Sequence, residues 1–261
     1  MTSPQVERID SASNATLKRL RLLARDSTAY REQGELWLDG DHLIRAALAR
    51  GQAPNLVLVS EEAMHQRPEW RELALSAPRV RVVPAKLFES VSGLPSATQI
   101  GATLAVPSAR GVLPDCATVV LDRLQDAGNV GTILRSAAAL GVKQVLALKG
   151  SAALGSPKVM RAAMGAHFGL HWVEGVSEAE LEQLTVPLVA TSSYAREALH
   201  RVDLPWPCAW VLGHEGQGVS DILLARCHTT VRIPQPGGEE SLNVAAAAAI
   251  CLYESLRRTL T

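Results

Sequence analysis

The chain has 261 residues, of which 47% are hydrophobic, enough for a buried core in one large domain or two small ones. Its apolar stretches are short and broken by charge or glycine, which excludes a membrane span, and the first residues lack the apolar region of a secretion signal. The formal net charge is zero, with 26 basic and 26 acidic residues, which argues against nucleic-acid binding unless the cations are clustered.

The cysteines give no sign of a disulfide framework. Cys116, Cys208, Cys227 and Cys251 are scattered and form no Cys-x-x-Cys pair. This usage is typical of reduced thiols, so we expect a cytoplasmic protein.

The N-terminal segment is locally basic. Between positions 8 and 31 the acidic residues are Asp10 and Asp26, with no glutamate, whereas six residues are basic: Arg8, Lys18, Arg19, Arg21, Arg25 and Arg31. Two interpretations stay open for this segment. It is either a solvated helix face or an RNA-facing patch that the global charge hides.

The first hundred residues alternate between helical and strand-like patterns. Ser13 and Asn14 precede leucines at helical spacing, which predicts a helix start. Strands are expected at 36–38, 55–59, 79–83 and 102–106, and helices at 41–50 and 85–91. The alternation predicts a small α/β domain over residues 1–107.

A linker is expected at residues 108–114, which are rich in small residues, glycine and proline. A second domain over 115–261 opens with a continuous apolar run at 117–121, typical of a parallel strand buried on both faces. Further strands are expected at 144–148, 188–191, 209–212 and 230–233, and helices at 130–140, 158–166, 219–227 and 242–260.

Two residues stand out on the first helix of this second domain. Asn129 directly precedes the helical pattern, where its simplest role is an N-cap. Arg135 lies among small apolar neighbours. An arginine there is either a snorkelling residue or part of a site.

A glycine-rich turn follows the strand expected at 209–212. Gly213, Gly216 and Gly218 lie between that strand and a helix, an arrangement that places backbone amides near a ligand or simply permits a tight turn. The spacing differs from the dinucleotide fingerprint, and no Lys-Ser or Lys-Thr follows, so a P-loop is excluded.

The last motif runs from a strand into the final helix. Pro234 and Pro236 precede Gly237 and Gly238, and the segment 239–241, Glu-Glu-Ser, suits a helix N-terminus. Residues 242–250 are almost all small, which lets this helix pack closely against another backbone.

Together these segments resemble the SpoU (TrmH-like) class of the SPOUT superfamily of RNA methyltransferases. The resemblance lies in Asn129…Arg135, in the Gly-x-Glu-Gly-x-Gly of 213–218 and in the Ile-Pro…Glu-Ser-Leu-Asn of 233–243. The segment 157–166 is similar to a Pro-Lys…Arg…Met-Gly-Ala segment of the class. Ala163, His214 and Gln217 replace the Ser, Asn and Arg common there. The resemblance covers 115–261 well and 1–107 loosely.

The resemblance implies an α/β fold in which a C-terminal parallel-sheet domain with a deep trefoil knot follows a small α/β RNA-binding domain. It implies S-adenosyl-L-methionine as the cofactor, no metal, and methyl transfer to a ribose 2′-hydroxyl. The implied cofactor-binding residues are Thr191, Gly213, Glu215, Ile233, Leu242 and Asn243.

The resemblance also assigns catalytic residues. Arg135 would activate the hydroxyl, or clamp a phosphate, because a guanidinium hardly loses its proton. The residues implied to orient Arg135 or the ribose are Asn129, Glu215, Ser241 and Asn243.

A homodimer is also implied, with Arg135 near the partner's cofactor site. In the last helix, Ile250, Leu252, Tyr253 and Leu256 could form the interface or the core, and we favour the interface. The expected RNA-binding residues are Arg8, Lys18, Arg19, Arg21, Arg25, Lys158 and Arg161.

The N-terminal domain favours 23S rRNA as the substrate. A tRNA 2′-O-methyltransferase and a catalytically silent knotted RNA-binding protein stay open as alternatives. A base-methylating relative is disfavoured by Arg135. An ordinary doubly wound nucleotide-binding enzyme is disfavoured because the glycine-rich turn comes late in the domain.

Overall fold

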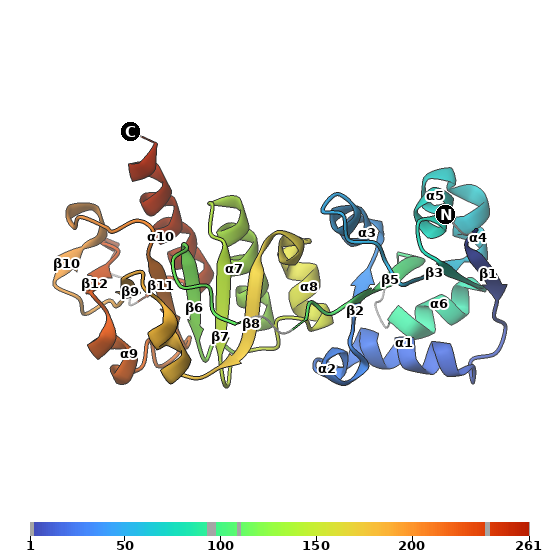
Figure 1. Ribbon diagram of the computed structural model, residues 1–261, viewed down its shortest axis with the longest axis horizontal. Helices are drawn as coiled ribbons and strands as arrows, with labels where there is room; N and C mark the ends of the chain where they lie inside the picture. The colour runs from blue at the N-terminus through green and yellow to red at the C-terminus, as the bar shows by residue number, and fades with distance from the viewer. Residues whose placement is uncertain (1–2, 93–97, 109–110, 238–240, 261) are drawn as a thin grey trace. The chain divides into compact units, whose positions relative to one another are not determined.

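The computed structural model describes residues 3–92, 98–108, 111–237 and 241–260. The chain divides into two compact units (Figure 1). The first unit contains residues 1–108 and 155–168, and the second contains 109–154 and 169–261. Of the expected linker, residues 109 and 110 lie outside the described ranges. Within those ranges no helix is long and apolar enough to cross a membrane.

The first unit is built on a mixed sheet. Strands β1 (Gln5–Arg8), β4 (Arg79–Val83) and β3 (Leu56–Ser60) are parallel neighbours, and β5 (Ile100–Ala105) runs antiparallel to β3 and to β2 (Glu35–Asp39). Helices α1 (Ala15–Arg25) and α6 (Ala85–Ser92) pack together, as do α3 (Asp41–Leu48) and α5 (Pro68–Leu75). Figure 1 shows the two pairs on opposite sides of the sheet.

The apolar pattern located most of these elements. The helix expected after Asn14 is α1, and the Asn14 side chain accepts a hydrogen bond from the Thr16 amide. The strand β1 and the helices α2 (Ala29–Gln33), α4 (Glu61–Gln66) and α5 were not expected. All four residues of β1 are exposed, so it carries no period-two burial signal.

The segment 155–168 belongs to the first unit, although the boundaries expected from the sequence placed it in the second domain. Its helix α8 (Pro157–Ala163) packs on β2 and α1. Gly155 permits this approach, because a Cβ there would lie 2.6 Å from the ring of Tyr30.

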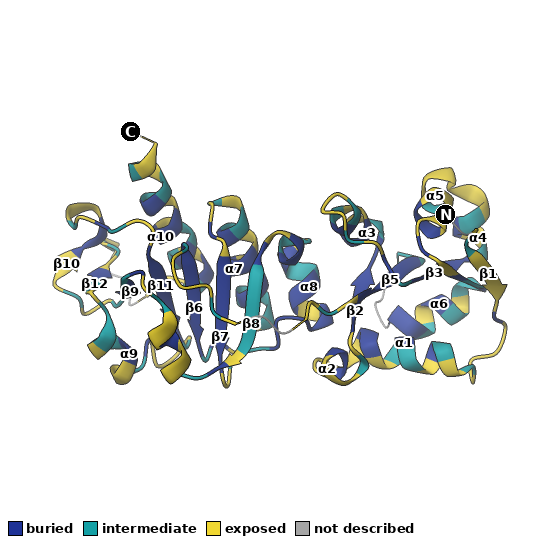
Figure 2. Cartoon of the chain, in the orientation of Figure 1, coloured by how far each residue is buried: buried dark blue, intermediate teal, exposed yellow. Residues whose placement is uncertain are grey.

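The second unit contains a parallel sheet, as expected. Its strand order is β10-β12-β9-β11-β6-β7-β8, and each pair of neighbours is parallel. The strands are β6 (Thr118–Asp122), β7 (Gln144–Leu148), β8 (His171–Val176), β9 (Leu188–Thr191), β10 (Glu197–Ala198), β11 (Ala209–Gly213) and β12 (Thr229–Arg232). Figure 2 shows β6, β7 and β11 buried along their length.

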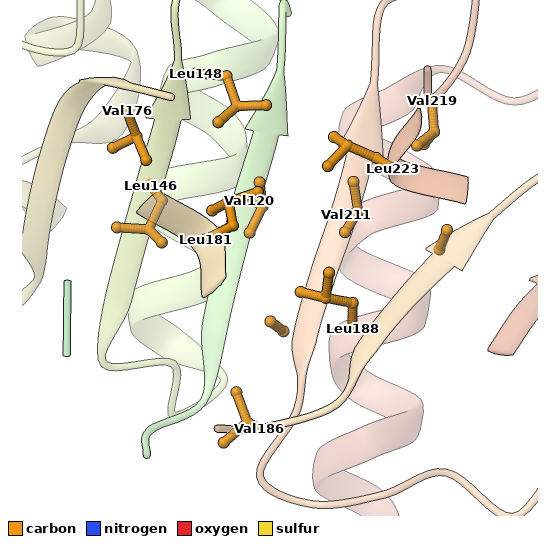
Figure 3. Close-up of a cluster of buried hydrophobic side chains, with 12 residues drawn as sticks. Val120, Leu146, Leu148, Val176, Leu181, Val186, Leu188, Val211, Val219 and Leu223 are labelled. Carbon is orange, nitrogen blue, oxygen red and sulfur yellow. The ribbon is translucent and has the colours of Figure 1, made fainter. Parts of the chain in front are cut away.

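The two faces of this sheet are covered differently. Helices α7 (Ala127–Ala139) and α10 (Val244–Thr259) pack together, and Trp210 of β11 reaches α10, where its indole N–H donates to the Ser255 hydroxyl at 3.0 Å. Alternate residues of the strands form an apolar cluster with Val219 and with Leu223 of α9 (Asp221–Arg226) (Figure 3). Because successive side chains of a strand point to opposite faces, the continuous apolar runs of these strands give the sheet two buried faces.

Two helix starts differ from the expected ones. Helix α7 begins at Ala127 with Asp126 as its N-cap, so the expectation that Asn129 is the N-cap was wrong. Asp126 precedes two small residues that fit the first turn, and its carboxylate accepts from the Asn129 amide at 2.7 Å. The N-cap of α10 is Asn243, while the expected cap residues Glu239 and Glu240, like Gly238, lie outside the described residues.

Candidate active site

A cavity of about 560 Å³ lies at the carboxyl ends of three parallel strands of the second unit. Thr191 ends β9, Gly213 ends β11 and Ile233 follows β12. The carboxyl edge of a parallel sheet is the usual place for a ligand, because loops and helix N-termini meet there. Apart from Asn243, all the expected cofactor-binding residues line this cavity: Thr191, Gly213, Glu215, Ile233 and Leu242.

The glycine turn forms one wall of the cavity as a tight loop. The amide of Gly218 donates to the carbonyl of His214 at 2.8 Å. Gly213 has no space for a side chain, because a Cβ there would lie 2.1 Å from the carbonyl carbon of Gly218 and from the nitrogen of Val219. Gly218 has a φ of 71°, which glycine adopts without strain. This loop, residues 213–219, is called the glycine loop below.

Three motifs that are far apart in the sequence meet through side-chain hydrogen bonds. The side-chain NH₂ of Asn129 donates to Glu215 Oε1 at 3.3 Å, and the side-chain NH₂ of Asn243 donates to Asn129 Oδ1 at 3.0 Å. Asn243 Oδ1 accepts from the amides of Ala245 and Ala246 at the start of α10. Because the helix takes the oxygen of Asn243, its NH₂ group must point to Asn129, so the direction of the whole chain of bonds is fixed.

Glu215 is the acceptor at the end of this chain. Its carboxylate also accepts from the backbone amides of Gln125 at 3.3 Å and Asp126 at 3.1 Å. Burial by itself would raise the pKa of Glu215, but the hydrogen bonds outweigh it and lower that pKa. Glu215 is therefore ionised at neutral pH, and it serves as a fixed negative acceptor that joins the glycine loop to α7.

Arg135 lies apart from this constellation within one chain. It is exposed on α7 and is absent from the cavity lining. Ser241 lines the cavity, and Asn243 stands between the lining residues Leu242 and Val244. The structure thus brings Glu215, Asn129, Asn243 and Ser241 to one place, and leaves Arg135 exposed outside it.

The basic residues of the first unit mostly have partners inside the same unit. Arg8 pairs with Asp10 and Glu61, and Arg19 pairs with Glu35. Both Arg21 and Arg25 donate to the carbonyl of Ser90, at 3.1 and 2.6 Å. Lys18 is exposed. The sequence could not show these partners, because they lie 16 or more residues away for all but Asp10.

The two expected cations of α8 differ in environment. Lys158 is exposed, whereas Arg161 lies 3.7 Å from a carboxylate oxygen of Asp39, whose side chain is 2% exposed. Burial raises the pKa of Asp39, and Arg161 and Ser92 offset only part of that effect. Arg161 therefore compensates a buried acid and helps to hold α8 on β2.

The cavity also contains residues that the sequence analysis missed. Ser192, Ser193 and Tyr194 follow β9 directly, and Gln235 follows β12. The polar run after a parallel strand was an available signal, because such positions lie at the carboxyl edge of the sheet. Gln235 Oε1 is buried, with no hydrogen-bond partner among the described residues.

The comparisons with known proteins agree on one family. A model described as the SpoU rRNA methylase family matches residues 117–253. An uncharacterized tRNA/rRNA methyltransferase of Synechocystis sp. is 32% identical over 257 residues, covering 96% of this chain and 93% of the relative. The 23S rRNA (guanosine-2′-O-)-methyltransferase RlmB of Bordetella pertussis is 40% identical over 144 residues, 54% of this chain and 59% of the relative, so that match spans little more than half of RlmB.

A solved structure is similar over nearly the whole chain. It is the SpoU methyltransferase AviRb from Streptomyces viridochromogenes, in complex with the cofactor AdoMet, which is S-adenosylmethionine. The TM-score is 0.85 at 25% identity, over 95% of this chain and 99% of that one. The likeness therefore extends across both units.

Proposed function

Because the chain belongs to the SpoU rRNA methylase family, we propose that it transfers the methyl group of S-adenosylmethionine to a ribose 2′-hydroxyl in 23S rRNA. The observation that carries this proposal is the single cavity at which Thr191, the glycine loop and the 241–243 segment converge. The reaction and the substrate class are those of the relative RlmB. The matching cofactor is that of AviRb.

The residues of the cavity fit S-adenosylmethionine. A volume of about 560 Å³ is within the usual range for a ligand of that size. The absence of a side chain on Gly213 lets the glycine loop fold back against the end of β11 and so form the wall of the cavity. Among the described residues Gln235 Oε1 has no partner, so it offers an acceptor for an amino or hydroxyl group. Leu242 and Ile233 would supply apolar contacts to the bound cofactor.

We further propose that the C-terminal segment forms a trefoil knot. Ile233 and Gln235, after β12, and Ser241 and Leu242, before α10, line the cavity that the glycine loop also lines, although β11 and β12 are separated by β9 in the sheet. Close passage of the two segments suits a knotted crossing. The small residues at the start of α10 permit it, because Ala245 and Ala248 are buried there.

The chain's own residues would position the ribose rather than supply the electrophile. When bound, S-adenosylmethionine supplies a methyl group made electrophilic by its sulfonium, so the protein must align the 2′-hydroxyl and lower the cost of losing its proton. Asn129 and Asn243 are held by the chain of hydrogen bonds that ends at Glu215. Their second amide N–H groups suit a ribose or phosphate oxygen.

Arg135 completes the proposed site from a second copy of the chain. Its planar guanidinium can donate two parallel hydrogen bonds to two oxygens of one phosphate. The exposed position on α7 suits a residue that acts across an interface. Positioning the RNA phosphate would hold the adjacent 2′-hydroxyl in line.

The first unit, which includes α8, is proposed to hold the RNA. Lys18 and Lys158 are exposed, and Arg21 uses only two of its five N–H groups in its contacts with Ser90 among the described residues. The remaining candidates are Arg8, Arg19, Arg25 and Arg161, whose acidic or carbonyl partners leave other N–H groups for phosphate. Such contacts position an RNA without reading its sequence.

The proposed homodimer uses an apolar groove beside α10. It has a volume of about 430 Å³ and is lined by Leu199, His200, Ile233, Pro234, Ala249, Ile250, Tyr253 and Glu254. Ile250 is 41% exposed and Tyr253 is 56% exposed, whereas Leu252 is buried within its own chain. Of the four residues of the expected interface, Ile250 and Tyr253 are thus exposed and available to a partner, Leu256 is half-buried, and Leu252 belongs to the core.

We expect Ile250→Glu to convert a dimer into a monomer, because a carboxylate at the centre of an apolar interface would lose its hydration. Light scattering coupled to size-exclusion chromatography measures the mass directly. The matched control is Ile222→Glu, which replaces another exposed isoleucine (60%) outside the groove. A dimer that survives Ile250→Glu would place the interface elsewhere.

The reaction is tested with methyl-labelled S-adenosylmethionine and total RNA from cells that lack this protein. Nucleoside mass spectrometry of the fractionated RNA is expected to give a labelled 2′-O-methylnucleoside in 23S rRNA. Label in tRNA would move the substrate to tRNA, and a base-methylated product would overturn the ribose assignment. Cofactor binding without incorporation into any RNA would support the silent RNA-binding protein instead.

A further inference from the structure

Asp122 is a buried acid that the proposed site does not use. It is the last residue of β6 and is 1% exposed. In the sheet it is the direct register partner of Gly213, the first residue of the glycine loop. Its carboxylate Oδ2 accepts a hydrogen bond of 2.7 Å from the amide of Ser220, the residue that follows the loop. Asp122 therefore contacts both ends of the glycine loop.

The carboxylate of Asp122 has a second partner, the guanidinium of the next residue, Arg123. Arg123 Nε donates to Oδ1 at 2.8 Å, and the Arg123 guanidinium also reaches Oδ2 at 3.4 Å. Arg123 adopts a φ of 59°, which a residue with a side chain rarely takes. A strained backbone and an adjacent ion pair around one buried carboxylate indicate that the surrounding structure holds Asp122 in place. A buried carboxylate is tolerated only with such partners.

The far end of the glycine loop is attached at two adjacent residues. The side chain of Val219 is 7% exposed and belongs to the apolar cluster beside Leu223 (Figure 3). The amide of Ser220 is held by Asp122, whereas the hydroxyl of Ser220 is buried with no partner among the described residues. Only the backbone of Ser220 therefore takes part in the attachment.

We propose that Asp122 is a positioning residue that keeps the glycine loop closed through the Ser220 amide, so that the loop is preorganised for S-adenosylmethionine. The inference rests on the proposed function, which places the cofactor against that loop. The hydrogen bond attaches the end of the loop to β6, and the pairing of β6 with β11 attaches the start of the loop to the same strand. Without the bond, the far end would keep the apolar contacts of Val219 and the bond between Gly218 and His214 inside the loop, and the loop would sample conformations that do not fit the ligand.

Ser220→Pro tests this by removing the amide N–H, together with the hydroxyl that Ser220→Ala removes alone. Ser220 has φ of −62°, which matches the fixed φ of proline. The dissociation constant for S-adenosylmethionine, measured by calorimetry, is expected to rise about tenfold or more, the scale of one charge-assisted hydrogen bond. The turnover number at saturating cofactor and the affinity for RNA are expected to change less than about twofold, because the loop is closed again once the ligand is bound.

Ser220→Ala is the matched control, because it keeps the amide and removes only the unpartnered hydroxyl. Its affinity for the cofactor is expected to equal that of the parent chain. Asp122→Asn is the second variant, in case proline prevents folding. It replaces one of the two accepting carboxylate oxygens with an NH₂ donor, which would face the N–H of either Ser220 or Arg123, and it removes the negative charge, so it is also expected to weaken cofactor binding.

The outcomes separate this inference from the proposed function. If the parent chain does not bind S-adenosylmethionine, the proposed function fails. If the parent binds and folded Ser220→Pro and Asp122→Asn bind equally well, the positioning role of Asp122 fails. A fall in turnover without a change in the dissociation constant would also overturn it, because the loop would then act on the reaction and not on binding.

Discussion

Arg135→Ala is expected to reduce methyl transfer at least ~100-fold, the scale of a lost positioning group, while the affinity for S-adenosylmethionine changes less than about twofold. The reason is the location of Arg135, which is exposed on α7 and does not line the cofactor cavity of its own chain. Its removal should therefore leave folding and cofactor binding intact, and affect only the proposed contact with the RNA phosphate. Single-turnover methyl transfer and calorimetry measure the two quantities.

Two further variants make the interpretation specific. Arg135→Lys keeps the charge but loses the paired N–H groups, so it should recover only part of the activity. Lys143→Ala is the control, because Lys143 is an exposed cation before β7, at the opposite edge of the sheet from the cavity. Parallel loss of cofactor binding and transfer in Arg135→Ala would mean that the residue is structural.

Gly213→Ala is expected to abolish cofactor binding and to destabilise the second unit by more than about 3 kcal/mol, beyond the usual cost of overpacking. The added Cβ would lie 2.1 Å from the carbonyl carbon of Gly218 and from the Val219 nitrogen. Both are backbone atoms, so no side-chain rotation can relieve the overlap, and the glycine loop must open. Thermal unfolding and calorimetric titration with S-adenosylmethionine report the two effects.

Gly216→Ala is the matched control in the same loop. The nearest atoms to its Cβ would be Cε1 and Nδ1 of His214, both at 3.8 Å, which is ordinary contact. Its stability is expected to stay within about 0.5 kcal/mol of the parent, as for most surface substitutions. If Gly213→Ala binds the cofactor as well as the parent chain does, the close crossing of the loop is not needed for binding.

The sequence by itself determined the parallel sheet and the three motifs of the site. The apolar runs at 144–148 and 188–191 coincide with β7 and β9, because a strand buried on both faces needs a continuous hydrophobic run. The glycine spacing and the Ser-Leu-Asn of 241–243 identified the family from local patterns alone. These features are local, so they are encoded within a few residues of where they act.

Only the tertiary structure decided which groups meet. Asp126, and not Asn129, caps α7, which releases the Asn129 side chain to join Glu215 to Asn243. The partners of Arg19 and Arg21, and the role of Asp122, depend on contacts across 16, 69 and 98 residues of sequence. Hydrophobic periodicity and secondary-structure propensity cannot predict such pairings, because they depend on how whole elements pack once the chain has folded.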